Sequence, residues 1–215
     1  MKINPTLVEE NMLRNLLMGN HSAREQAILA QPPEMQPKIR KFIKAKRENE
    51  NLVQIMLSDL SRASKLVKDN PDDQFLRRMT IRCFAATVEG ILYGLKILGK
   101  ASGEICGYQF TDAEMFLLTE KQDKQKKLRR LVFRENMIET FKLFAKVNGG
   151  CCLTDFDQSG FQSLCKTFDL RNRLMHPKSP MTFYVSDVEK QKCAEASAWL
   201  DNELNRLLGA CGKKM

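Results

Sequence analysis

The chain has 215 residues, of which 35 are lysine or arginine and 26 aspartate or glutamate, leaving a net charge of +9. This length can bury a real core, so we expect one domain plus a helical extension. The charge favours a polyanionic partner without requiring one. Seven cysteines, with no C-x-x-C pair and no signal peptide, indicate reduced thiols. No apolar run approaches the ~20 residues that a membrane span needs. We therefore expect a cytoplasmic protein without membrane contact.

The apolar residues recur every three or four positions, as in amphipathic helices, and no convincing strand alternation occurs. Residues 4–30 predict one or two helices, closed by a proline cluster. A long helix is predicted from Lys38 to Lys68. Asn70-Pro71-Asp72-Asp73 then provides a stop and a new start. We place the domain boundary there, with an N-terminal helical extension over 1–71 and a helical bundle over 72–211.

The predicted bundle begins with a strongly apolar helix over about 73–98, which we expect at its centre. A loop from Gly99 to Gly107 should follow it. The remaining helices are a short one opened by the capping box Thr111-x-x-Glu114, one over about 127–147, one over about 157–176, and a last one from the capping box Ser186-x-x-Glu189 to Gly209. Four to five helices with short loops predict an all-α, antiparallel bundle.

One stretch breaks this binary pattern, Asp169-Leu-Arg-Asn-Arg-Leu-Met-His176-Pro177. At about 100° per residue, Asn172 lies near the middle of an apolar stripe, with Arg171 on one margin and His176 on the other, roughly 140° apart. That stripe consists of Phe161, Leu164, Cys165, Phe168 and Met175. Pro177 disfavours the helical region for the residue before it, so His176 should lie at or past the last turn. A cation, an amide and an imidazole in this arrangement indicate a functional site.

Arg171-Asn172-x-x-x-His176 resembles the signature of the HEPN superfamily, in which an arginine, usually followed by a polar residue, precedes a histidine near the end of a helix. Outside the motif the resemblance is architectural, over about residues 72–208. It implies a HEPN-like bundle. Many members are metal-independent endoribonucleases whose active site joins two such motifs across a homodimer. For this chain the resemblance implies RNA as substrate, no cofactor or metal, and Arg171 and His176 as the catalytic pair with Asn172 between them.

The resemblance also implies a toxin or defence effector, with an antitoxin or a nucleotidyltransferase as a protein partner. In one sub-family the motif continues as His-x-Tyr, and the partner nucleotidyltransferase modifies that tyrosine. This chain departs from the pattern, because Lys178 stands at that position and the nearest tyrosine is Tyr184.

The chemistry of RNA cleavage suits these residue types. The 2′-hydroxyl of RNA can attack the adjacent phosphorus, so an enzyme needs only proton transfer and stabilisation of charge. We expect Arg171 to bind the scissile phosphate, because its planar guanidinium matches phosphate oxygens in pairs. Asn172 can donate to the phosphate or accept from the 2′-hydroxyl. His176 is the general acid or the general base, and sequence leaves these two roles open. Since one motif supplies one histidine, we prefer a composite site across a dimer.

Further residues are candidates for holding RNA. Arg173 competes with Arg171 for the phosphate, with a solvated surface arginine as the alternative. Lys178 and Tyr184, in the next loop, are expected to line the same groove. Two basic runs are candidates for the RNA backbone, although such runs are most often solvated helix faces. The first, over 121–134, includes Lys124, Lys127 and Arg130, and the second spans Lys38 to Arg47.

Other readings carry less weight. One alternative is a non-catalytic HEPN-type module that binds nucleotide, RNA or a protein through the same groove. Another is a structural protein that dimerises through residues 1–70. The P-loop-like segment Gly94 to Ala101 is rejected, because alanine replaces the magnesium-binding Ser or Thr and the segment continues a helix. We also set aside a zinc site, a Cys–His hydrolase and a magnesium cluster. The residues concerned are Cys151, Cys152, Asp155, Asp157 and Asp169.

Overall fold

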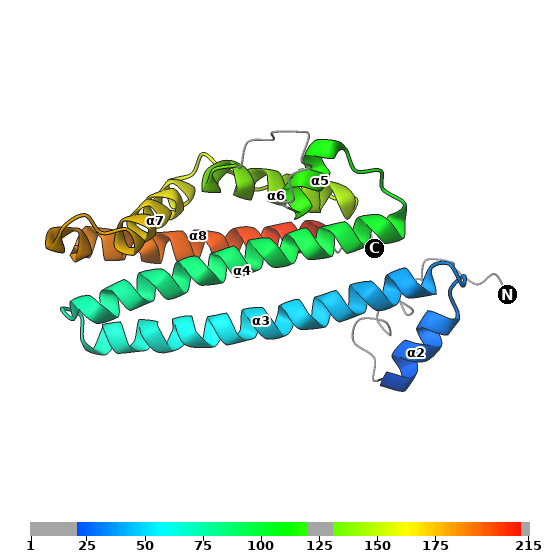
Figure 1. Ribbon diagram of the computed structural model, residues 1–215, viewed down its shortest axis with the longest axis horizontal. Coiled ribbons are helices and arrows are strands. Elements are labelled where there is room, and N and C mark those ends of the chain that lie inside the picture. Colours follow the sequence, from blue (N-terminus) through cyan, green and yellow to red (C-terminus); the bar gives the residue numbers. More distant parts are fainter. Residues whose placement is uncertain (1–20, 120–130, 212–215) are drawn as a thin grey trace.

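The computed structural model describes residues 21–119 and 131–211, and within these ranges every regular element is a helix. The prediction of an all-α bundle is confirmed (Figure 1). The elements are α2 (His21–Leu29), α3 (Gln36–Asp69), α4 (Gln74–Cys106), α5 (Asp112–Thr119), α6 (Phe133–Val147), α7 (Ser159–Met175), the 3-10 turn η1 (Pro180–Phe183) and α8 (Asp187–Cys211). None of these helices is both long enough and apolar enough to cross a bilayer.

Helix α4 is the centre of the bundle, as its apolar sequence predicts. It packs against α3 on one side and against α5, α6, α7 and α8 on the other (Figure 1). The main core lies between α4, α6, α7 and α8. Its largest fully buried side chains include Ile81, Met137, Phe141, Phe161, Leu164 and Leu174.

Helices α3 and α4 form a long antiparallel hairpin (Figure 1). The predicted stop and restart between them is confirmed: the carboxylate of Asp73 caps α4 by accepting from the backbone N–H groups of Phe75 and Leu76, at 2.7 and 3.1 Å. The two helices approach closely at Gly90 and Gly94, where a Cβ atom would overlap the side chains of Met56 and Asn49 on α3. The expected division into residues 1–71 and 72–211 stays a prediction.

Arg77 links the start of α4 to the loop before α8 through hydrogen bonds. Its side chain is 3% exposed, and it donates to the carbonyl oxygens of Pro71 and Val185 at 2.6 and 2.9 Å. A further bond of 2.8 Å reaches a carboxylate oxygen of Asp187. Beside it, the amide of Gln74 both donates to and accepts from the backbone of Val185. The loop after α7 is therefore held against the bundle by buried polar contacts.

The prediction of a loop from Gly99 to Gly107 is wrong. Helix α4 continues to Cys106, and only Gly107, with φ of 68°, ends it in the left-handed conformation. Tertiary packing overrides the low helix propensity of this segment. Ala101 and Gly103 are buried, and the ring of Phe110 folds back against Gly103 so closely that a Cβ atom there would overlap it.

The other helix boundaries lie close to the predictions. Both capping boxes form: Thr111 and Glu114 exchange backbone–side-chain bonds of 2.8 and 3.2 Å, and Ser186 and Glu189 do so at 2.9 and 3.3 Å. Helix α8 runs two residues past the predicted Gly209. In the predicted helix over about 127–147, Leu131 and Val132 are not helical, and α6 begins at Phe133. Residues 1–20 and 120–130 lie outside the described residues. The predictions of helices over 4–30 and 127–147 fall partly on these residues.

Candidate functional site

Helix α7 carries the motif on its last two turns. Phe161, Leu164 and Phe168 are buried, as the apolar stripe predicts. The stripe does not continue to Asn172 and Met175, however, since Asn172 is exposed and Met175 is 51% exposed. The expectation of a core-facing amide is therefore wrong. On these last turns other apolar residues, Leu170 and Leu174, are buried in the core instead.

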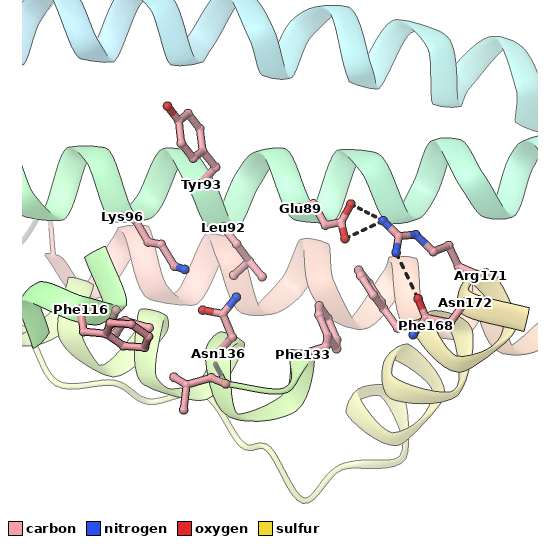
Figure 2. Close-up of a pocket in the computed structure, with 12 residues that line it drawn as sticks. Glu89, Leu92, Tyr93, Lys96, Phe116, Phe133, Asn136, Phe168, Arg171 and Asn172 are labelled. Carbon is pink, nitrogen blue, oxygen red and sulfur yellow. Dashed lines mark hydrogen bonds and ion pairs between the residues drawn. The ribbon is translucent and has the colours of Figure 1, made fainter. Parts of the chain in front are cut away.

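Arg171 projects toward α4, where it meets Glu89 (Figure 2). Its Nη2 donates to both carboxylate oxygens of Glu89, at 2.7 Å each, and its Nη1 donates to Oδ1 of Asn172 at 3.1 Å. The Arg171 side chain is 29% exposed and that of Glu89 48%. The structure thus brings Arg171 and Asn172 together, and a carboxylate from a distant part of the chain orients the guanidinium.

Arg171 and Asn172 form one end of a cavity of about 670 Å³. Its walls come from α4, α5, α6 and α7, and they combine aromatic rings with two cations and two amides (Figure 2). The lining residues are Glu89, Leu92, Tyr93, Lys96, Phe116, Leu117, Leu131, Phe133, Asn136, Phe168, Arg171 and Asn172.

His176 ends α7, as Pro177 predicts. Its backbone leaves the helical region, with φ of −127° and ψ of 62°, and its N–H donates to the carbonyl oxygen of Asn172 at 3.0 Å. The residue is exposed and is not part of the lining of the Arg171 cavity. Within one chain, therefore, Arg171 faces the cavity, and His176 lies outside it at the exposed C-terminal end of the same helix.

Arg173 has structural partners. Its Nη2 donates to the carbonyl oxygen of Tyr184 at 2.7 Å, and its Nη1 pairs with Glu189 at 3.0 Å. These contacts tie the end of α7 to the following loop and to α8. Lys178 and Tyr184 are exposed in that loop, outside the lining of the cavity that contains Arg171. Lys178 and Tyr184 are therefore not observed in one groove with Arg171. A role of Arg173, Lys178 and Tyr184 in RNA binding stays a prediction.

Of the two basic runs, the structure describes the one on α3. Lys124, Lys127 and Arg130 lie outside the described residues. In the second run, on α3, several cations are paired with carboxylates. The pairs are Arg40–Glu25, Lys41–Glu104 at 2.7 Å and Lys46–Glu50 at 2.6 Å. This pairing is typical of a solvated helix face, the alternative interpretation of such runs.

The sequence reasoning missed the contributions of α4 and α6 to the site. Glu89 is the one carboxylate in the apolar segment from Phe75 to Leu98, and Lys96 lies two turns after it. Charged residues inside an apolar helix were the signal that could have identified both. Asn136 and Phe116 carry no comparable signal, because their sequence neighbourhoods are ordinary for amphipathic helices.

The P-loop-like segment that was set aside is part of a helix. Gly94 to Ala101 lies within α4 and follows no strand, so the rejection of a P-loop is confirmed. Among residues 21–119 and 131–211, no group of three histidine, cysteine, aspartate or glutamate side chains is placed to hold a metal ion.

Cys193 is buried in the core, and this burial raises the pKa of its thiol to about 12.

Comparison of this chain with protein-family models, with curated proteins and with solved structures gave no match. The functional argument therefore depends on the motif and on the geometry around it.

Proposed function

We propose that this protein is a metal-independent endoribonuclease of the HEPN type, which acts as a homodimer in the cytoplasm, as a toxin or defence effector. One observation carries the proposal. Arg171 directs its guanidinium into a cavity, and His176, five residues later, is exposed at the end of the same helix. Neither side chain is buried in the core, so both are available to a substrate.

Arg171 is the group that binds the scissile phosphate. Its two terminal nitrogens already donate to oxygen acceptors, the Glu89 carboxylate and the Asn172 amide. A phosphate that displaces Glu89 meets a guanidinium held in position on a rigid helix. Charge-assisted bonds of this kind stabilise the negative charge that develops on the phosphorane during the reaction.

His176 transfers protons. The 2′-oxygen of the ribose attacks phosphorus while a base takes the hydroxyl proton. The bond from phosphorus to the 5′-oxygen breaks, and an acid protonates that oxygen. The products carry a 2′,3′-cyclic phosphate and a 5′-hydroxyl, and no other reactant is consumed. Two histidines, one from each chain of the dimer, supply the acid and the base.

Exposed apolar residues beside the motif support dimerisation. The segment from Met175 to Val188 contains four large apolar side chains that are more than half exposed: Met175 at 51%, Met181 at 79%, Tyr184 at 54% and Val188 at 64%. His176 belongs to this segment. Four such side chains within 14 residues of the chain are a candidate dimer interface. Pairing through it brings two copies of the motif together.

The proposal is tested by incubating the purified protein with single-stranded RNA in EDTA. We expect cleavage that leaves 2′,3′-cyclic phosphate ends. Arg171→Ala and His176→Ala should each lower the rate by at least about 100-fold. Lys166→Ala, a change at an exposed lysine earlier on α7, is the control and should leave the rate unchanged. If all variants bind RNA but the parent protein cleaves no RNA tried, the protein is a non-catalytic module of the same type.

A further inference from the structure

We propose that the cavity beside Arg171 binds one unstacked nucleobase of the RNA, next to the phosphate that Arg171 holds. This inference rests on the ribonuclease function proposed above and names the feature of the substrate that the enzyme reads. The substrate is then RNA that is single-stranded at the cleavage position, because a paired base cannot enter a cavity.

The cavity has the size and the composition of a ligand site. Its volume of about 670 Å³ falls within the range of small-molecule pockets, roughly 300–1,000 Å³. Of the lining residues named above, seven are hydrophobic or aromatic and five are polar or charged, a combination that can both cover a ligand and fix its orientation (Figure 2).

Aromatic rings supply surfaces on which a base can stack. Phe133 on α6 and Phe168 on α7 are stacked on each other, with centroids 3.5 Å apart and planes at 12°. Both line the cavity near Arg171, and Phe116 on α5 lines its other end (Figure 2). Stacking on aromatic side chains is the usual way in which proteins hold unpaired bases.

Two polar side chains can recognise the edge of the base. Lys96 on α4 is 5% exposed, and its amine points toward the amide of Asn136 on α6 (Figure 2). Asn136 offers both a donor and an acceptor, which is what the Watson–Crick edge of a base requires. A base bound between these groups and the phenylalanine rings leaves its phosphate at the Arg171 end of the cavity.

The experiment measures binding of the four nucleoside 5′-monophosphates and of inorganic phosphate to the full chain by calorimetry. At least one nucleotide should bind about tenfold more tightly than phosphate. Asn136→Leu and Phe116→Ala should each weaken that binding about tenfold, with an unchanged far-UV CD spectrum. Asn202→Leu, the same substitution at an exposed asparagine of α8, is the matched control and should not change it.

A cleavage assay separates this inference from the ribonuclease proposal. We expect single-stranded RNA to be cut faster than the same sequence in a duplex, with a base preference that Asn136→Leu relaxes. Nucleotide binding that depends on Asn136, without cleavage of any RNA, would support the base-binding cavity and overturn the nuclease. Cleavage that is unaffected by Asn136→Leu and Phe116→Ala, together with no nucleotide binding, would overturn the cavity and leave the nuclease intact.

Discussion

Arg171 is positioned by Glu89, a residue 82 positions earlier in the chain. Both side chains are partly exposed, so their ion pair contributes little to folding, roughly 1 kcal/mol at most. Its effect on function is more direct, because a phosphate and Glu89 compete for the same guanidinium nitrogen. Glu89 is therefore a positioning residue in this account, and it holds Arg171 ready while the site is empty.

Glu89→Gln should lower the KM for RNA by about 1.5- to 5-fold, because it removes the competing negative charge of an exposed ion pair. The kcat should stay within about twofold, since Arg171 still binds the phosphate in the transition state. Steady-state kinetics at low salt measure both. Glu139→Gln, which breaks an exposed ion pair with Lys142 on α6, is the control and should change neither. A collapse of kcat in Glu89→Gln would mean that Glu89 takes part in the chemistry.

Among the helices, the two capping boxes show what local sequence determines well. Each consists of neighbouring residues whose side chains close on the same helix turn, so the pattern alone predicted both. The boundaries that were missed depend on distant contacts. Helix α4 passes through Gly99 because α6 and Phe110 pack on its last turns, and no local pattern around the glycines reports that packing.

The first capping box is expected to make stability depend on pH. Burial of the Glu114 carboxyl by itself raises its pKa, but bonds from the Thr111 backbone, Lys146 and Tyr108 outweigh it and lower the pKa from 4.5 to about 2. Because the folded pKa is below the unfolded one, the stabilisation is present above about pH 4.5 and is lost as the pH falls through about 2.

Glu114→Gln should therefore lower the free energy of unfolding by about 2 kcal/mol at pH 7. The difference from the parent protein should shrink below pH 4.5 and vanish near pH 2, which urea titrations at several pH values can follow. Glu139→Gln removes an exposed carboxylate on α6 and should cost no more than about 0.5 kcal/mol. An equal loss of stability for Glu114→Gln at pH 7 and pH 2 would refute the assignment.

At the scale of the whole molecule, the helical class and the central position of α4 followed from the spacing and the amount of apolar residues. The motif itself was also recognisable in the sequence, because histidine, arginine and proline stand at the end of one predicted helix. The cavity was not predictable, since four helices contribute to it and its central polar residues, Lys96 and Asn136, are far apart in the chain. The apolar stripe was followed to Asn172 because the pattern alone does not show which face of the last turns of α7 the neighbouring elements cover.

The proposed dimer predicts a dependence on the exposed segment after α7. Met181→Asp places a charge on a side chain that is 79% exposed, so the monomer should keep its stability within about 0.5 kcal/mol. The dimer should weaken, since a charge is then buried in its apolar interface, and cleavage should fall in parallel. Ultracentrifugation measures the dissociation constant. Ile55→Asp, at an exposed position of α3, is the control and should leave dimer and activity unchanged. Normal dimerisation of Met181→Asp would place the interface elsewhere.

The most direct test of the account mixes the parent protein with an equal amount of the inactive variant His176→Ala and measures RNA cleavage in EDTA. If the site needs one histidine from each chain, only dimers of two parent chains are active. After full exchange these are about a quarter of all dimers, so the rate should fall to about a quarter of that of the parent protein at the same total concentration. A rate of about half, although mass spectrometry shows that mixed dimers have formed, would mean that each chain acts on its own and would contradict the composite site.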